Sequence, residues 1–191
     1  PELTRKIRDI AFSGDGEPTM VQNFDEVAKV VLEVKREMQL NDTKIVLITD
    51  AAGLDKATVR RGLDLMDKNN GEVWAKLDAG TEGYFRTVNR TSVKFQRVLD
   101  NICTTAKARP ILIQSLFLKI YGEPMSQQEL EAYCERLNNI TASGGQISQV
   151  QAYTVARPAP ETFATRLTKK ELEKMARVIC ANTGLKVQTY D

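Results

Sequence analysis

Short apolar runs alternate along the chain with longer segments of helical periodicity. The apolar, β-branched runs predict buried strands, and the segments between them place apolar residues three and four positions apart, as helices do. The first such helix begins at Asn23 or Asp25, and its apolar positions are Val27, Val30, Val31, Val34 and Met38. The strands are expected over residues 8–13, 44–49, 72–78, 111–117 and 147–155, with a last short one over 185–189.

Polar residues with side-chain oxygen atoms mark where several helices begin. Asp55 is expected to cap a helix that runs to about Asp67, and a short helix is expected from Thr81 to about Val88. Ser126-Gln-Gln-Glu129 and Thr168-Lys-Lys-Glu171 both match the capping box, in which the first and fourth side chains satisfy each other's backbone N–H groups.

The strands start roughly one βα unit apart, about 30 residues, which is the repeat of a parallel sheet. Alternating strands and helices favour an α/β fold with right-handed crossovers. Five or six units are too few for a closed eight-stranded barrel, which leaves a partial barrel or an open doubly wound sheet. A chain of 191 residues is expected to form a single domain over 1–191.

Composition narrows the classes of partner. The chain is 42% hydrophobic and 27% charged, with a net charge of +2, so no overall charge demands nucleic acid or a membrane. This balance does not exclude a tRNA-sized partner that meets one local patch. No apolar run approaches the ~20 residues of a membrane span, and no signal-peptide pattern opens the chain, so we expect a cytoplasmic protein.

A glycine-rich turn follows the first expected strand, in Gly14-Asp-Gly-Glu-Pro18. Two glycines allow positive φ angles and a close approach of backbone to ligand, while Pro18 stiffens the exit. We expect the Glu17 carboxylate to be exposed there, with backbone N–H groups around it. The carboxyl ends of parallel strands are where α/β proteins bind ligands.

Polar residues recur at the same ends of the later strands. Lys76 and Asp78 share one face of their strand by period-two alternation, and a lysine on a buried face is costly unless it pairs with an acid or a ligand. A structural pairing of these two residues alone is an equally good explanation. The whole series is explained better by a site, and it comprises Thr49 and Asp50, Lys76 and Asp78, Gln114 and Ser115, and Gln149, Gln151 and Tyr153.

The three cysteines do not form a ligand motif. Cys103, Cys134 and Cys180 are far apart in sequence and fall on or beside the apolar stripes of expected helices, so we interpret them as small buried hydrophobic residues. The chain has no histidine, which removes the commonest general base and zinc ligand. We therefore expect no metal ligands within this chain.

Three segments, in the same order, resemble radical S-adenosylmethionine (SAM) enzymes. Phe12-Ser-Gly-Asp-Gly-Glu-Pro-Thr19 resembles their glycine-glutamate motif on the second strand. Val73-Trp-Ala-Lys-Leu-Asp-Ala-Gly-Thr81, with Tyr84-Phe-Arg86 and Asn89-Arg90, is similar to the fourth-strand region of iron–sulfur oxidoreductases related to wyosine-synthesis enzymes, which modify tRNA. Gln149 to Pro158 is similar to their sixth strand and the loop after it.

This resemblance implies a partial (β/α)6-type TIM-like barrel lacking its first strand. Family members hold a [4Fe–4S] cluster on Cys-x3-Cys-x2-Cys after the first strand, so the cluster ligands are expected before Pro1. The intact enzyme would reduce SAM at the cluster, generate a 5′-deoxyadenosyl radical and abstract a substrate hydrogen. An electron donor such as flavodoxin or ferredoxin is implied, and the substrate stays open, with tRNA or another protein as options.

The resemblance also assigns roles to residues of the series. The methionine end of SAM would meet Gly14, Gly16 and Glu17, and its ribose would meet Thr49 and Asp50. The cavity near SAM would be lined by Lys76 and Asp78, and the adenine would lie near Gln151 and Tyr153. A substrate would contact Arg90, through an anionic group, together with Gln114 and Ser115.

Two other interpretations are open at this point. Lys76 would be a Schiff-base nucleophile in a different barrel enzyme, which borohydride trapping of a carbonyl substrate would detect. Alternatively, the chain is a truncated barrel domain that folds or binds a partner without catalysis. A truncated barrel would leave the strand over 8–13 as an unpaired edge, for which we expect a tendency to aggregate.

Overall fold

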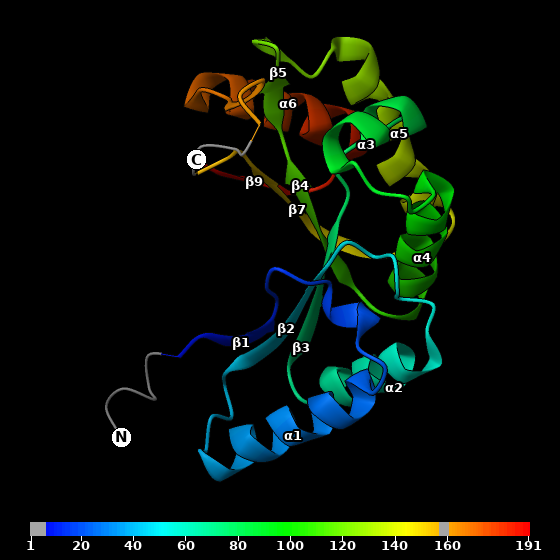
Figure 1. Ribbon diagram of the computed structural model, residues 1–191, viewed down its shortest axis with the longest axis vertical. Coiled ribbons are helices and arrows are strands. Elements are labelled where there is room, and N and C mark those ends of the chain that lie inside the picture. The colour runs from blue at the N-terminus through cyan, green and yellow to red at the C-terminus, as the bar shows by residue number, and fades with distance from the viewer. Residues whose placement is uncertain (1–6, 157–160) are drawn as a thin grey trace. The chain divides into compact units, whose positions relative to one another are not determined.

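The computed structural model describes residues 7–156 and 161–191 and divides into two compact units, Pro1–Ala75 and Lys76–Asp191 (Figure 1). Each unit is built from βα repeats. The alternation that the sequence predicts is therefore present in both.

The first unit contains three parallel strands. Strand β2 pairs with β1 on one side and with β3 on the other, so that Leu47 lies opposite both Phe12 and Val73. Figure 1 shows helices α1 and α2 side by side on one face of these strands, where they pack against each other. The elements are β1 (Asp9–Phe12), the 3-10 turn η2 (Pro18–Met20), α1 (Phe24–Glu37), β2 (Lys44–Thr49), α2 (Ala57–Asp67) and β3 (Gly71–Lys76).

Helix α1 forms where the periodicity predicts it, but it buries other residues than its predicted stripe. Phe24 and Ala28 are each 1% exposed, and Phe24 packs so closely on α2 that a Cβ at Gly62 would lie 2.5 Å from its ring. The predicted stripe is largely exposed, at Val27, Val30, Val34 and Met38. The spacing of apolar residues identified the helix correctly. The face that packs within the described part of the unit lies beside the predicted stripe on the helix surface.

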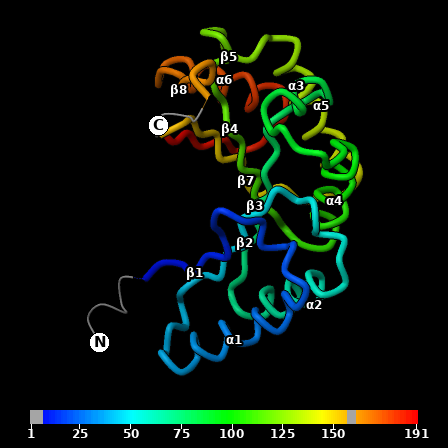
Figure 2. Tube along the Cα trace, in the orientation of Figure 1, coloured from blue at the N-terminus to red at the C-terminus, as the bar shows by residue number. Residues whose placement is uncertain are grey.

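The second unit contains the parallel strands β4, β7 and β9, with β7 in the centre. Helices α3 to α6 pack in succession beside them, as the trace in Figure 2 shows. A small antiparallel sheet of β6, β5 and β8 was not predicted, because its strands are only two or three residues long. The elements are α3 (Glu82–Asn89), α4 (Phe95–Ala108), β4 (Ile111–Leu116), β5 (Leu118–Ile120), β6 (Glu123–Pro124), α5 (Gln127–Ala142), β7 (Ile147–Tyr153), β8 (Ala164–Arg166), α6 (Lys169–Thr183) and β9 (Val187–Tyr190).

The predicted helix starts are confirmed in part. Thr168 and Glu171 form the complete capping box of α6, and Thr81 caps α3 through its hydroxyl. Ser126 caps α5, but the Glu129 carboxylate does not reach back to it. The prediction for Asp55 is wrong, because α2 begins at Ala57 and Lys56 occupies its N-cap position. Among the described residues, no helix has the length and apolar character needed to cross a membrane.

Candidate functional site

Glu17 ends the glycine-rich turn after β1, and its carboxylate is held by groups of the first unit. Its Oε1 atom accepts hydrogen bonds from the Thr19 N–H at 3.0 Å, the Thr19 hydroxyl at 2.6 Å and the Thr49 hydroxyl at 2.5 Å. Its Oε2 atom accepts one from the Asp50 N–H at 2.8 Å. The carboxylate is half-buried rather than exposed, so the expected exposure is wrong while the expected backbone donors are present.

The two carboxylate oxygens of Glu17 accept different numbers of hydrogen bonds. A carboxylate has about four acceptor positions, two on each oxygen. Three donors already crowd Oε1, whereas Oε2 accepts one hydrogen bond among the described residues, from the Asp50 N–H, and has room for a second. Added Cβ atoms at Gly14 and Gly16 would meet nothing within 4 Å, so the backbone beside Glu17 is open. The turn can therefore receive a ligand that carries a hydrogen-bond donor or a positive charge.

The turn after β2 supplies the partners of Glu17. The Thr49 side chain is fully buried, and its hydroxyl accepts the Ala51 N–H at 3.0 Å while it donates to Glu17. Ala51 has a φ of +66°, a left-handed conformation that costs energy in a residue other than glycine. The Asp50 carboxylate accepts the Ala52 N–H at 2.8 Å. The structure thus brings together Glu17, Thr49 and Asp50, as the sequence predicts.

In the second unit, Asp78 lies just beyond β3 and is buried. Its Oδ1 atom accepts the Leu116 N–H at 2.7 Å, and its Oδ2 atom accepts the Asn89 side-chain amide at 3.1 Å. Burial raises the pKa of this carboxyl, against the opposing effects of the two hydrogen bonds and of the Lys76 charge. A buried carboxyl with a raised pKa beside an ammonium group is suited to hydrogen-bonding a polar ligand.

Lys76 and Asp78 interact without forming an ion pair. Lys76 is half-buried and takes part in none of the ion pairs found within 4.0 Å among the described residues. The Asp78 charge also reaches three tyrosines, Tyr84, Tyr133 and Tyr153, whose pKa values are raised first by burial. The pKa of Tyr84 is raised to about 12, by burial, then Glu129, then Asp78, and that of Tyr153 is raised by burial and then Asp78. The predicted cavity residues Lys76, Asp78 and Tyr153 therefore lie in one electrostatic neighbourhood.

Asn89 contacts Asp78, although the sequence predicted no role for it beyond its place in the Asn89-Arg90 motif. Its amide nitrogen binds Asp78, and its Oδ1 atom is buried and has no hydrogen-bond partner among the described residues. Buried polar atoms are nearly always paired, so such an orphan calls for an explanation, and a ligand donor is one. The signal in the sequence is positional, since Asn89 is the last residue of the helix that follows the Asp78 strand.

We expect Asp78→Asn to be more stable than the unchanged protein at pH 7. Because the pKa of Asp78 is raised in the folded state, its folded form holds the proton more tightly, and stability is lost as pH rises from the ordinary value of 3.8 to the raised value. Asparagine does not titrate, and a half-turn of the Asn89 amide would present its orphaned carbonyl oxygen to the new amide group. Urea unfolding at pH 4 and pH 7 measures the difference, which should grow with pH.

Asp78→Ala serves as the matched comparison. It removes the acceptor of the Leu116 N–H without a replacement, so it should destabilise the protein at both pH values. If the stability that Asp78→Asn gains over the unchanged protein were smaller at pH 7 than at pH 4, burial would not be raising the pKa of Asp78.

The predicted residues on β4 and β7 separate into two groups. Gln114 donates to the Gln151 carbonyl oxygen at 3.2 Å, and Gln151 shares its strand face with Tyr153. Ser115 points to the other face of β4, where its hydroxyl is fully buried, donates to the Leu77 carbonyl at 2.6 Å and lies 2.6 Å from the Tyr133 hydroxyl. Ser115 is thus a core contact to α5 and is not brought together with Gln114.

Arg90 lies on the surface at the end of α3, in a left-handed conformation with φ +48°. Its guanidinium forms an ion pair with Glu161, so the residue predicted to meet a substrate anion is paired here with an acid of its own unit. Arg157 and Pro158, which complete the motif after β7, fall outside the described residues.

The cysteines do not fit an iron–sulfur cluster. They are free and stand on three different helices, and no group of three histidine, cysteine or acidic residues within the described residues is placed to hold a metal. The prediction that all three are buried is correct only for Cys134, whose pKa is raised by burial, since Cys103 is half-buried and Cys180 is exposed. No chemical step through a cluster is therefore derived from this chain.

Comparison with known proteins finds similarity in sequence and in fold. No family model matches the chain. The UPF0026 protein slr1464 of Synechocystis sp. is 26% identical over 155 residues, which cover 79% of this chain and 51% of that protein. The chain thus spans about half the length of this curated relative.

Two crystal structures have a similar fold. A domain of pyruvate-formate lyase-activating enzyme from Bacteroides vulgatus has a TM-score of 0.64 at 14% identity, covering 95% of this chain and 98% of that one. SuiB of Streptococcus suis, solved with SAM bound, has a TM-score of 0.64 at 12% identity, covering 96% of this chain and 39% of that one. The predicted partial-barrel α/β class and the resemblance to radical SAM enzymes are therefore confirmed at the level of the fold.

Proposed function

We propose that this chain is the SAM-binding core of a radical SAM enzyme. The fold match to SuiB, a protein solved with SAM bound, supports this assignment. The observation that carries it is the Glu17 carboxylate, fixed at the carboxyl end of β1 with one acceptor position open on Oε2. The amino group of the SAM methionine is an ammonium donor that suits this position.

The first unit holds Glu17 ready for such a ligand. Thr19, Thr49 and the Asp50 N–H fix the carboxylate before any ligand arrives, so little side-chain freedom is lost on binding. The open backbone at Gly14 and Gly16 leaves room for the carboxylate and amino groups of a methionine moiety. In this proposal Thr49 acts mainly by positioning Glu17, and Asp50 faces the ribose.

By the resemblance to radical SAM enzymes, we assign the polar residues of the second unit to the remainder of SAM and to a substrate. Lys76 and Asp78 offer a charged donor and a buried acceptor, while Gln151 and Tyr153 offer an amide and an aromatic ring for the adenine. The orphaned Asn89 carbonyl adds an acceptor beside Asp78. We assign Arg90 and Gln114 to the substrate, with tRNA or another protein as its class.

The cluster belongs, in this proposal, to a segment before Pro1. Two features of the first unit support a further βα unit at that side. Within the described residues, β1 pairs on one edge only, with β2, and α1 exposes the apolar residues Val30 and Val34. A preceding strand would pair with the open edge of β1, and its helix would cover this stripe. The electron donor would then be a flavodoxin or ferredoxin.

We expect Glu17→Gln to weaken SAM binding by about tenfold or more, because a hydrogen bond between charged groups contributes ~1.5–3 kcal/mol. Glutamine keeps the shape and an acceptor for Thr49, whereas alanine would leave several buried donors unpaired. Calorimetric titration of the complete protein with SAM measures the effect.

5′-Methylthioadenosine provides a ligand control, since it keeps the adenosine and lacks the amino acid. Its affinity should be the same for both proteins. Unchanged SAM affinity in Glu17→Gln, or an equal loss for both ligands, would rule out the ammonium contact.

A further inference from the structure

A pocket of about 530 Å³ lies at the other end of the first unit, away from the Glu17 turn. It is formed by α1 from Lys29 onward, by residues that follow α2, and by residues that precede β2 and β3, so it belongs to the amino ends of these strands. Its lining carries four cations, Lys29, Lys35, Arg36 and Lys68, and a single acid, Glu33. Three asparagines complete its polar wall.

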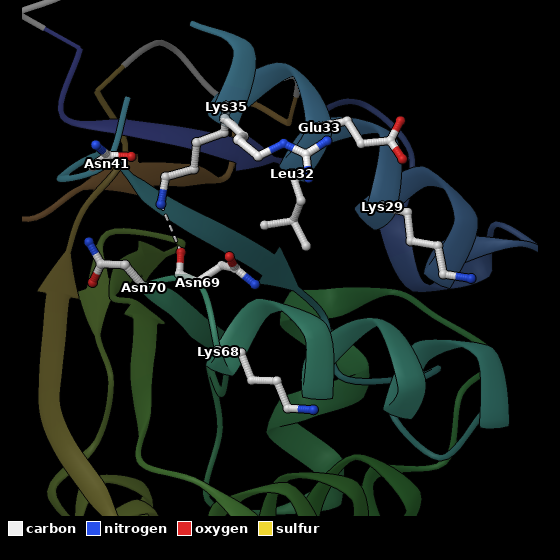
Figure 3. Close-up of a pocket in the computed structure, with 9 residues that line it drawn as sticks. Lys29, Leu32, Glu33, Lys35, Asn41, Lys68, Asn69 and Asn70 are labelled. Atoms are coloured by element: carbon white, nitrogen blue, oxygen red, sulfur yellow. Dashed lines mark hydrogen bonds between the residues drawn. The ribbon is translucent and has the colours of Figure 1, made fainter. Parts of the chain in front are cut away.

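Lys35 is the unusual member of this lining. It is 7% exposed, and its ammonium donates to the Asn69 carbonyl at 2.9 Å, as Figure 3 shows. An ammonium group has three donors, and Lys35 forms no ion pair among the described residues. A buried charge without a counter-charge is costly, so an anion in the pocket would compensate it.

Stabilisation of the helix dipole explains only some of these cations. Lys35 and Arg36 lie in the last turn of α1, where positive charge is favourable. Lys68 is the C-cap of α2, where positive charge is also favourable, but Lys29 is two turns from the end of α1. In Figure 3, Lys29, Lys35 and Lys68 surround Leu32 from three sides. Cations from two helices line one cavity, and this is the feature that calls for a ligand.

We propose that this pocket binds a phosphate ester of nucleotide size. Ammonium and guanidinium groups are the side chains that bind phosphate, and asparagine amides add neutral donors and acceptors. A volume of about 530 Å³ exceeds the needs of a phosphate ion and falls in the range of small-molecule sites. The site is separate from the proposed SAM site and does not depend on it.

The test follows the side-chain amide signals of Asn41, Asn69 and Asn70 by ¹⁵N NMR during titration of the full chain. The probes are inorganic phosphate, adenosine monophosphate and adenosine. Both phosphate compounds should shift these signals, and adenosine should not. Reading the pocket's own amides distinguishes this site from adenosine binding elsewhere.

The variant Lys29→Gln/Lys68→Gln should weaken the affinity for adenosine monophosphate about three- to tenfold, as removal of two exposed charge contacts does. Arg60→Gln is the matched control, because Arg60 is exposed on α2 and outside the lining, and its affinity should be unchanged. Equal shifts with adenosine, no shift with either phosphate compound at 10 mM (about the weakest specific binding of interest), or an equal loss in Arg60→Gln would overturn the proposal.

Discussion

Replacing Gly80 with alanine is expected to cost more than about 3 kcal/mol of folding stability. The added methyl carbon would lie 2.1 Å from the backbone nitrogen of Tyr133 and 2.5 Å from the carbonyl carbon of Ala132. Both atoms belong to the backbone of α5, so no side-chain rotation can relieve the clash, and the loop or the helix must move. Urea unfolding of the purified variant measures the loss.

The approach is this close because α5 binds the loop on both sides of Gly80. Glu129 accepts the Gly80 N–H at 2.6 Å and the Thr81 N–H at 2.9 Å through one oxygen, and the Thr81 hydroxyl at 2.6 Å through the other. Arg136 donates to the Gly80 carbonyl at 3.0 Å. A shift of this loop would break these bonds and displace Asp78, which stands two residues earlier, so we expect the site in the second unit to be disturbed as well.

Gly83→Ala is the internal control for this prediction. Gly83 lies in helix α3, an added Cβ would meet nothing within 4 Å, and alanine is the better helix former. Its stability should rise by about 0.5–1 kcal/mol. Similar small changes for both alanine variants would show that α5 can retreat from the loop, against the packing described above.

Glu129 also illustrates how far the sequence pattern reaches. Ser126-Gln-Gln-Glu129 predicted a helix start, and the helix does start there, because that signal is local. The destination of the glutamate carboxylate is 48 or 49 residues away in the chain, at Thr81 and Gly80. The same four residues are compatible with a capping box and with a glutamate that binds another part of the chain. The folded structure shows that Glu129 does the second.

The exposed stripe of α1 is a second case in which a local pattern predicts a helix but not the contacts of its side chains. Apolar residues spaced three and four apart identify a helix, but they do not tell which neighbour covers them. In the first unit α1 packs on α2 through Phe24 and Ala28, while Val30 and Val34 face outward. The βα spacing predicted the parallel strands correctly. Each strand and each helix has a local signal in the sequence, and each crossover between strands has one favoured hand.

For the candidate site in the first unit, the sequence predicted which residues are neighbours, but it did not predict the hydrogen bonds between them. The carboxyl ends of β1 and β2 bring their following turns to one edge, so Glu17, Thr49 and Asp50 were expected to be neighbours. That Glu17 would be held by Thr49 at 2.5 Å and become half-buried depends on a register that no local pattern encodes. The chain's own donors fill Oε1 and leave the second acceptor position on Oε2, which is the one that the proposed ligand would use.

Thr49→Val is expected to destabilise the protein by about 2–4 kcal/mol, since the substitution removes a hydrogen bond to a charged group and a second one from a buried N–H. Valine preserves the volume, but the buried Thr49 hydroxyl donates to Glu17 at 2.5 Å and accepts the Ala51 N–H at 3.0 Å. The loss of the second bond is costly because Ala51 is held at φ +66°. Thermal and urea unfolding measure the change.

Thr49→Ser separates the hydroxyl from the methyl group. Serine keeps both hydrogen bonds and loses one buried methyl, so its cost should be about 1 kcal/mol, and its SAM affinity should stay near that of the unchanged protein. In Thr49→Val the Glu17 carboxylate loses a fixed donor and gains freedom, so SAM affinity should fall even at temperatures where the variant is folded. Equal SAM affinity in the folded valine and serine variants would mean that Thr49 stabilises the turn without positioning Glu17 for a ligand.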